Sequence, residues 1–336
     1  NYNFLENLKF SKKIFWPCSE MKLYIDNENK FLKVFEVNKT TTKNKKVFYM
    51  VENKKLMSDL NRIIKFSKST KLLVKKKISK IINTNLLKGI KLEKKINSHY
   101  NLIIVCTGNN SQLTKNFINE EFYRHSYDEL AITTILKHEY IDNLVARQIF
   151  SDGEILALLP ISNNKTSVVL SIKKNFSKRK INNILLRKKI KFYANNFFKK
   201  IEFNSNFEIK ELNLSIRKKY HNERVLLFGD ALHSVHPLAG QGTNMTLRDL
   251  KILKQILNNK INLGLDIGSD DVLSEFERIA KAKNFAYSLG IDFIRKSFKL
   301  KKKSLKIFRN RIMLEINKKN VLKNIFFNIA NKGLRF

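Results

Sequence analysis

Residues 224–250 constrain the fold more than any other part of the chain. They are predicted to form a buried strand, a turn, a glycine-containing loop and the start of a helix. Residues 225–228 are an apolar run of strand-forming types that ends at Gly229 and Asp230, which is typical of a strand covered on both faces. In open α/β sheets, ligands bind where strands end at the carboxyl edge. Asp230 is therefore predicted to meet a ligand.

The loop after this strand has residue types that let a flat ligand approach the backbone. Pro237 fixes its own φ and favours extended geometry at His236, while Gly240 and Gly242 permit conformations and close approaches that a side chain forbids. A helix is predicted to follow from the helical spacing of the apolar residues Leu247, Leu250, Ile252, Leu253 and Ile256.

Thr243 or Asn244 is predicted to cap this helix. The free N–H groups at its amino terminus would then face the loop and favour negative charge, by roughly 0.3 to 2 kcal/mol for the dipole alone. We therefore predict that an anionic or electron-rich group binds there.

These residues also carry a family resemblance. Gly229-Asp-Ala-Leu-His233, followed by Pro237 and Gly240-Gln-Gly-x-Asn244, resembles the second flavin motif of the aromatic-ring monooxygenases of the para-hydroxybenzoate hydroxylase fold. Within that group, the sequence HPLAGQG at 236–242 with LRD at 247–249 is most similar to the ubiquinone-biosynthesis hydroxylases. Shorter similarities follow the family's order along the chain, at 51–56, 146–150, 156–160, 266–269 and 309–310.

The resemblance implies an FAD site and assigns its residues. These are Gly229, Asp230, Pro237, Gly240, Gln241, Gly242, Thr243 and Asn244. Asp230 would hydrogen-bond the ribityl hydroxyls, and Pro237 would lie against the flavin ring. The N–H groups of 240–243 would stabilise the reduced flavin at N1 and the C2 oxygen, as an oxyanion hole does. Asn244 would cap the helix and reach the pyrimidine edge.

The chemistry implied by the resemblance resides in the cofactor. Reduced flavin and O2 form a C4a-hydroperoxyflavin, whose distal oxygen an electron-rich phenol attacks, so the protein supplies placement and dryness. The sequence therefore names no catalytic acid or base. His233 and His236 lie three residues apart, and with no third ligand in view they predict no metal site.

Two departures from the family pattern affect this assignment. The family opens with a Gly-x-Gly-x-x-Gly turn that holds the FAD pyrophosphate, whereas the first glycine here is Gly89 and the chain begins at Asn1, which predicts an incomplete amino terminus. The family's Gly-Ala-Asp-Gly-x-x-Ser motif corresponds to VCTGNNS at 105–111, where Thr107 stands in place of the aspartate. The arginine that follows the motif in the family is replaced by Thr114. Reduction by NAD(P)H or by another electron donor therefore stays open, and a purely structural role for 102–108 is an equal alternative.

The resemblance implies an α/β fold. An FAD-binding doubly wound, Rossmann-like domain, without its first βαβ unit, is interleaved with an antiparallel β-sheet substrate domain and a C-terminal helical region. We predict the FAD-binding domain at 1–20, 49–112 and 214–262, the substrate domain at 21–48 and 113–213, and the helical region at 263–336. Strand-like runs near 70–106 would join the nucleotide-binding sheet, and helices are predicted at 51–66 and 181–198.

Composition excludes several other classes of protein. Cys18 and Cys106 are the only cysteines, which argues against a disulfide framework and fits a reducing, cytoplasmic location. The net charge of +37 is spread along the chain without a zinc-finger, RNP or helix-turn-helix signature, so nucleic acid is not a predicted partner. The densest basic stretch, 295–323, is interleaved with apolar residues, which suits either a helix pair on an anionic membrane surface or an ordinary packed surface helix.

Two functional hypotheses follow. In the first, the intact protein is an FAD-dependent monooxygenase that hydroxylates a prenylated phenol with O2 in ubiquinone biosynthesis, peripheral on the inner face of a membrane and near other enzymes of that pathway. In the second, motivated by Thr107 and Thr114, a catalytically degenerate flavin fold serves as a scaffold or binding component of a membrane-associated biosynthetic complex.

Overall fold

The computed structural model describes most of the chain, and its residues group into two compact units. The described residues are 1–27, 30–38, 46–74, 76, 78–84, 86–92, 95–108, 113, 122–174, 182–236, 240–300, 302–319 and 323. The first unit comprises residue 1, 68–127 and 213–292, and the second comprises 2–67, 128–212 and 293–336. The domain boundaries given above, which are functional, remain a prediction. They differ from these units at 2–20, 49–67 and 113–127, and the helical region predicted at 263–336 is divided between the two units after residue 292.

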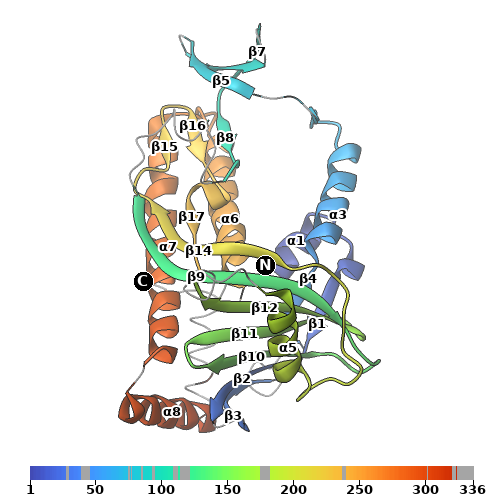
Figure 1. Ribbon diagram of the computed structural model, residues 1–336. Helices are drawn as coiled ribbons and strands as arrows, with labels where there is room; N and C mark the ends of the chain where they lie inside the picture. Colours follow the sequence, from blue (N-terminus) through green and yellow to red (C-terminus); the bar gives the residue numbers. More distant parts are fainter. Residues whose placement is uncertain are drawn as a thin grey trace. The chain divides into compact units, whose positions relative to one another are not determined.

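The first unit contains two small sheets and the long helix α6 (Figure 1). Its strands and helices are β5 Ile78–Asn83, β6 Lys88–Leu92, β7 Lys95–Tyr100, β8 Ile103–Val105, β15 His221–Asn222, β16 Val225–Leu227, the 3-10 turn η3 Gly229–Ala231, β17 His233–Ser234 and α6 Gln241–Asn262. β16 lies between β15 and β8, antiparallel to β15 and parallel to β8. The predicted strand at 225–228 is therefore confirmed.

β16 is the centre of the first unit's core. Val225, Leu226 and Leu227 are completely buried. They belong to one apolar cluster with residues of α6 and of α7 Asp270–Phe298, including Leu253, Ile256, Leu273 and Phe276. A strand covered on both faces explains why the run has no polar residue at alternate positions.

The strands near 70–106 differ from the sequence prediction. Only β8 joins the sheet of β16, whereas β5, β6 and β7 pair antiparallel with one another in a sheet of their own. Short connections at 84–87 and 93–94 link these three strands, and antiparallel hairpins need only such short connections, whereas parallel neighbours require a crossover. Ile81 of β5 nevertheless belongs to the same apolar cluster as β16.

The second unit is built on a broad, mostly antiparallel sheet (Figure 1). Its elements are α1 Tyr2–Asn7, η1 Lys12–Ile14, β1 Phe15–Cys18, β2 Glu20–Asn27, β3 Lys30–Val37, β4 Phe48–Val51, α3 Asn53–Phe66, β10 Val145–Ser151, β11 Glu154–Ser162, β12 Lys165–Lys173, α5 Asn183–Ala194, β13 Glu202–Phe203 and α8 Lys303–Lys318. β9 Phe122–Lys137, β14 Glu208–Arg217 and α7 each contribute residues to both units.

In this sheet the strand order is β9, β12, β11, β10, β2 and β3, with β13 also paired to β9. The expected antiparallel pattern holds for every pair except β2 and β10, which run parallel. The long connection between these two strands makes parallel pairing possible. One face is covered by α5, whose Leu186, Ile190 and Tyr193 pack on strand residues such as Leu158 and Leu170.

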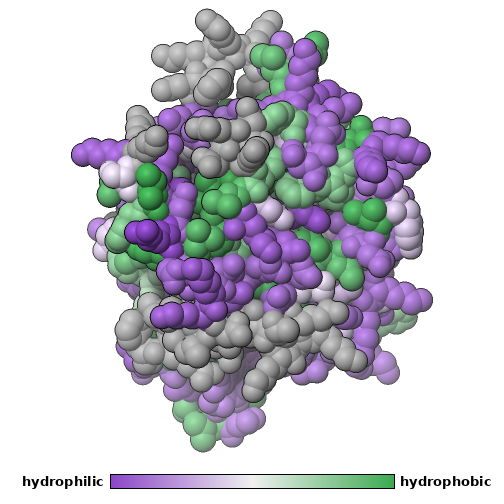
Figure 2. All heavy atoms as spheres, turned by 90° about the horizontal axis from the view of Figure 1, so that it is seen from below, coloured by the Kyte–Doolittle hydropathy of each residue, from purple (hydrophilic) through white to green (hydrophobic). Residues whose placement is uncertain are grey.

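The basic stretch at 295–323 forms the end of α7 and α8. α8 packs against β3, where Asn317 Oδ1 accepts a hydrogen bond from the Glu36 backbone N–H at 2.9 Å and Met313 is buried. Leu305, Phe308 and Ile312 remain exposed at 42%, 64% and 43%. The view of Figure 2 shows hydrophobic side chains in separate patches among hydrophilic ones. One side of α8 is thus packed, as in an ordinary surface helix, while another side keeps its apolar residues exposed.

None of the helices in the described part of the chain carries a stretch apolar enough to cross a bilayer.

Arg224 links the loop before α7 to Asn101, which precedes β8. Arg224 donates from Nη1 to the Asn101 carbonyl at 3.1 Å and pairs with the Asp266 carboxylate, which holds the pKa of Asp266 below its usual value. Asp266 Oδ1 also accepts from the Gly268 N–H at 2.9 Å. A Cβ built at Gly268 would lie 1.8 Å from the Asn101 oxygen, so only glycine fits there.

We therefore expect Gly268→Ala to lower the free energy of unfolding by roughly 1 to 3 kcal/mol, because backbone must move to admit the methyl group. Gly290→Ala is the matched control: Gly290 lies in α7 with open space at its Cβ, so alanine should stabilise by roughly 0.5 to 1 kcal/mol. Thermal unfolding followed by circular dichroism measures both. Equal melting temperatures for the two variants would contradict the packing at Gly268.

Candidate functional site

The predicted site begins where two parallel strands end side by side. β8 and β16 are in register over Ile103/Val225, Ile104/Leu226 and Val105/Leu227, and the Phe228 N–H donates to the Val105 carbonyl at 3.0 Å. The turns that follow, at 106–108 and at 229–231, therefore leave the same edge of the sheet. This is the carboxyl edge at which α/β sheets bind ligands, as the sequence predicted for Asp230.

The turn after β16 presents Asp230 outward. Gly229 has a φ of +64°, and a Cβ at this position would touch Thr246 Cγ2 of α6 at 3.6 Å. Asp230, in the 3-10 turn, is exposed, whereas Gly229 and Ala231 on either side are buried. The turn thus rests on α6 and leaves one carboxylate in the open.

Arg217, at the end of β14, holds this turn in place, and the sequence alone did not identify it. Its backbone N–H donates to the Leu232 carbonyl at 2.9 Å and its Nε to the Ala231 carbonyl at 2.8 Å. The side chain is fully buried, with the guanidinium 4.2 Å from the centre of the Phe122 ring. The only signal was an arginine at the end of an alternating strand, which is too common to distinguish it.

Residues 233–236, which follow η3, run inward. His233 and His236 are each 1% exposed, and the His236 ring meets Tyr127 edge-on at 5.3 Å between centroids. β17 pairs with β14 through Ser234/Ser215 and His233/Ile216. Pro237, one of the predicted flavin contacts, lies outside the described residues.

The helix after the loop starts earlier than predicted. α6 begins at Gln241, and its N-cap is Gly240, with a φ of +65°, rather than Thr243 or Asn244. That prediction was wrong because the residue before the first turn of this helix is left-handed, a conformation that glycine takes without steric cost. Thr243 and Asn244 lie exposed in the first turn, where Asn244 Oδ1 accepts from Asn1 Nδ2 at 2.6 Å.

The residues around the start of α6 fit an electron-rich planar group. Among the described residues, no atom lies within 4 Å of the Cβ position of Gly240, and only Val235 Cγ2, at 4.0 Å, lies near that of Gly242, so this backbone is open to close approach. No described side chain caps the helix, and its first turn holds no acidic residue, so its N–H groups retain their positive potential. Gln241 Oε1 is buried and has no hydrogen-bond partner among the described residues.

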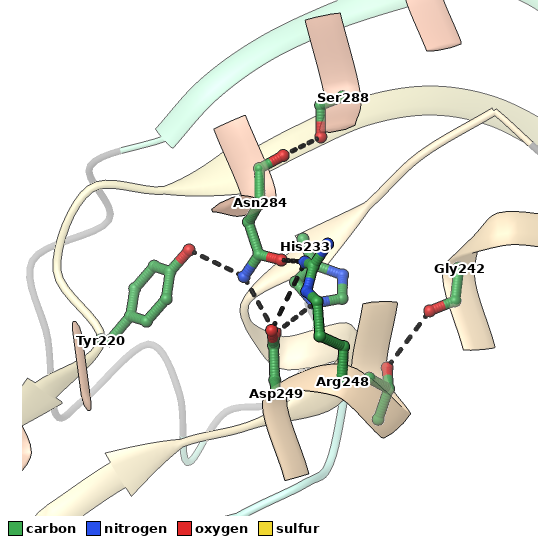
Figure 3. A network of polar contacts seen from close by, with 8 residues as sticks. Tyr220, His233, Gly242, Arg248, Asp249, Asn284 and Ser288 are labelled. Carbon is green, nitrogen blue, oxygen red and sulfur yellow. Dashed lines mark hydrogen bonds and ion pairs between the residues drawn. The ribbon is translucent and has the colours of Figure 1, made fainter. Parts of the chain in front are cut away.

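Behind this loop lies a buried polar network (Figure 3). Asp249, in the third turn of α6, is 0% exposed, and its Oδ2 lies 3.0 Å from His233 Nε2 and 2.9 Å from Asn284 Nδ2 of α7. Asn284 Nδ2 also donates to Tyr220 Oη at 3.2 Å, and burial raises the pKa of Tyr220, so its phenol stays protonated. Arg248 donates from Nη2 to Asn284 Oδ1.

The turn after β8 carries the departure noted in the sequence. Thr107 is exposed, and Gly108 has a φ of +80° with open space at its Cβ position. No carboxylate stands at position 107, and Thr114 lies outside the described residues. This turn therefore has a left-handed glycine but no charged side chain at position 107.

A family model described as an FAD binding domain matches residues 82–277, more than half of the 336 residues. The chain belongs to this FAD-binding family. Its match runs from β5 to α7 and includes both turns and the start of α6. FAD is accordingly the cofactor of this fold, and the open glycines, the exposed Asp230 and the uncapped helix fit it.

Curated relatives have names from one pathway. The chain is 25% identical over 271 residues to "Ubiquinone biosynthesis monooxygenase COQ6, mitochondrial" of Xenopus tropicalis, covering 70% of this chain and 58% of that protein. It is 36% identical over 111 residues to the protein of the same name in Dictyostelium discoideum, covering 33% and 22% of the two chains. With "3-demethoxyubiquinol 3-hydroxylase" of Escherichia coli it shares 33% identity over 105 residues, or 31% and 27% of the two chains. The chain thus spans less than two thirds of these relatives' lengths.

Solved structures agree on the fold. p-Nitrophenol 4-monooxygenase PnpA from Pseudomonas putida matches with a TM-score of 0.76 at 11% identity, over 100% of this chain and 86% of that one. Klebsiella pneumoniae HpxO complexed with FAD and uric acid matches with a TM-score of 0.71 at 13% identity, over 98% and 85% of the two chains. The predicted α/β fold of the flavin monooxygenases is therefore confirmed.

Gly240→Ala tests whether the flavin ring approaches this backbone. A methyl group in the left-handed region costs about 1 to 2 kcal/mol of stability, and in the open space at Gly240 it would also obstruct a bound ring. We expect the affinity for FAD, measured by fluorescence titration of the intact protein, to fall tenfold or more, or about 1.4 kcal/mol.

Gly153→Ala is the matched control. Gly153, between β10 and β11, has a φ of +82° and only Lys173 Cε, at 3.9 Å, near its Cβ position among the described residues, so alanine there carries a similar backbone strain away from residues 240–242. Both variants should lose similar stability, but the control should keep the wild-type FAD dissociation constant. A similar loss of affinity in both, or in neither, would remove Gly240 from the cofactor site.

Proposed function

We propose that the intact protein is an FAD-dependent monooxygenase that hydroxylates the aromatic ring of a prenylated phenol with O2 in ubiquinone biosynthesis. The observation that carries this proposal is the geometry of one segment. Exposed Asp230 follows a buried strand at the carboxyl edge, and Gly240–Gly242 present open backbone at the start of a 22-residue helix. The names of the curated relatives support the choice of substrate class.

The chain's own residues would bind and orient the cofactor. When bound, FAD supplies two-electron redox chemistry and the activation of O2. Asp230 would accept hydrogen bonds from the ribityl hydroxyls, and the N–H groups of 241–243 would donate to the electron-rich edge of the ring. Pro237, Gly229, Thr243 and Asn244 complete the proposed cofactor site. No side chain is assigned as a catalytic acid or base.

The proposal includes an electron donor that reduces the flavin. Thr107 replaces the family's aspartate at the turn after β8, so either NAD(P)H or another donor would reduce the flavin. The same substitution motivates a second candidate, a flavin-fold scaffold in a membrane-associated complex that does not turn over.

One experiment separates the two candidates. The intact protein is purified, titrated with FAD, and supplied with a reductant and a prenylated phenol while oxygen uptake and hydroxylated product are measured. Bound flavin with substrate-dependent oxygen uptake and product supports the hydroxylase. A protein that binds pathway enzymes but stays colourless in FAD supports the scaffold and overturns the enzyme assignment.

Asp230→Ala should reduce FAD affinity about tenfold, because a carboxylate hydrogen-bonded to hydroxyls contributes roughly 1.5 to 3 kcal/mol. Since Asp230 is exposed, the melting temperature of the FAD-free protein should hardly change. Asp142→Ala removes an exposed carboxylate in the second unit and should leave FAD binding intact. Wild-type FAD affinity in Asp230→Ala would refute the role assigned to this residue.

We further propose that the protein acts on the cytoplasmic, inner face of an anionic membrane, where a prenylated substrate dissolves and where other enzymes of the pathway are partners. The support is the exposed stripe Leu305, Phe308 and Ile312 of α8, flanked by exposed Lys302 and Arg311. Apolar side chains beside lysine and arginine suit an anionic lipid surface, where each cation adds roughly 1 kcal/mol.

Phe308→Ser should weaken binding to vesicles of phosphatidylglycerol and phosphatidylcholine roughly tenfold, since burying a phenylalanine contributes about 1.5 to 3 kcal/mol. Ile184→Ser on α5, with 64% exposure equal to that of Phe308, is the control and should bind like wild type. Cosedimentation with vesicles measures both. Equal binding by the two variants would argue against α8 as the membrane contact.

A further inference from the structure

The buried network behind residues 240–242, where the proposed function places FAD, has a geometry that assigns a proton position. Asp249 Oδ2 faces two nitrogens, and a carboxylate oxygen can only accept from both. His233 Nε2 must then carry its hydrogen. His233 Nδ1 is buried and has no hydrogen-bond partner within the described residues. Within the part of the chain that the structure describes, the polar link of this ring therefore runs to Asp249.

The orientation of Asn284 is equally determined. Its Nδ2 serves two acceptors, Asp249 Oδ2 at 2.9 Å and Tyr220 Oη at 3.2 Å, while its Oδ1 accepts from Arg248. Rotating the amide by 180° would place its oxygen against the carboxylate and its N–H groups against a guanidinium. The amide and the carboxylate thus each meet partners of the right kind, which is what a buried carboxylate requires.

The link between His233 and Asp249 closes a ring in the chain. The 17 residues from 233 to 249 run from β17 through the loop to the third turn of α6 and return through one hydrogen bond. Gly240, Gln241 and Gly242 lie inside that ring. Opening it would restore freedom to this segment, because closing a loop restricts the positions its residues can take.

We propose that Asp249, Asn284 and Tyr220 are positioning residues for FAD: acting through His233, they hold the backbone of 240–242 in the shape that receives the flavin, without touching it. This inference rests on FAD binding at that loop, which is part of the proposed function. It assigns a role to α7, because Asn284 of α7 would support residues 240–242 at the start of α6.

The test is a double-mutant cycle that exchanges the two buried groups. Asp249→Asn points an amide N–H at another donor, and Asn284→Asp brings two carboxylates together, so each single variant should lose FAD affinity about ten- to hundred-fold. In the double variant, the amide nitrogen now at position 249 would take the place of Oδ2 and donate one N–H to the carboxylate now at position 284 and the other to His233 Nε2, whose hydrogen would move to Nδ1. The carboxylate at position 284 would also accept from Arg248 and Tyr220. FAD affinity and the visible circular dichroism of the bound flavin should return to near wild type.

Tyr220→Phe is a milder variant, which we expect to fold even if the single exchanges do not. It removes only the hydroxyl that accepts from Asn284 Nδ2, so FAD affinity should fall about two- to tenfold with a shifted flavin spectrum. The control is a similar buried network in the second unit, where Asn143 Nδ2 donates to Thr166 Oγ1 at 3.0 Å beside His138. Asn143→Ala should lower the melting temperature but leave the FAD dissociation constant and spectrum unchanged.

The outcomes separate this inference from the proposed function. Wild-type protein that binds FAD, together with unchanged affinity and spectrum in Tyr220→Phe, Asp249→Asn and Asn284→Asp, overturns the positioning role and leaves the flavin site standing. A double variant no better than the singles also overturns it, because hydrogen-bond complementarity would then not be the cause. A wild-type protein that fails to bind FAD refutes the proposed function and this inference together.

Discussion

Burial of β16 on both faces is the constraint on which the rest of the first unit depends. Three residues, Val225 to Leu227, are fully buried, and each apolar side chain placed in such a core contributes roughly 1.5 to 3 kcal/mol. Because β16 is parallel to β8 and lies under α6 and α7, its carboxyl end is fixed in direction. The next residues must turn sharply, and Gly229 provides the left-handed φ that makes the turn. Asp230 is exposed as a consequence of that turn.

Polar groups fix the course of the loop after β16, which the apolar core alone does not. Apolar packing is not directional, so it can bury β16 without fixing the course of the loop after it. Arg217 binds two successive carbonyls in the loop, at Ala231 and Leu232, and Asp249 binds the ring of His233. These buried groups are costly unless each is paired, and their pairing selects one loop conformation over others. The second unit uses the same device, where His138, Asn143 and Thr166 bond to one another beneath the turn at 162–165.

The sequence predicted the elements whose residue types have local causes. The strand at 225–228, the long helix after the glycines and the helices at 53–66 and 183–194 follow from apolar period and from glycine and proline. The cap at Gly240 was missed because threonine and asparagine are the commoner caps, and a preference cannot reveal a positive φ. The separate sheet of β5 to β7 and the parallel pairing of β2 with β10 depend on contacts between distant segments. Periodicity within one segment carries no information about which strand becomes its neighbour.

For the candidate site too, the sequence predicted only part of what the structure shows. The proposed cofactor residues lie close together in sequence, so spacing and resemblance could suggest them together. Arg217 of β14, Tyr220 before β15 and Asn284 of α7 lie outside that segment and have no motif. The sequence analysis named Asp249 only as part of the family-like sequence LRD at 247–249 and assigned it no role. The turn after β8 makes a related point: Gly108 has a left-handed φ of +80°, whereas the exposed Thr107 beside it carries no charge. The conformation of a turn and the charge it displays are set by different residues. The shape of this turn therefore gives no support to any particular electron donor.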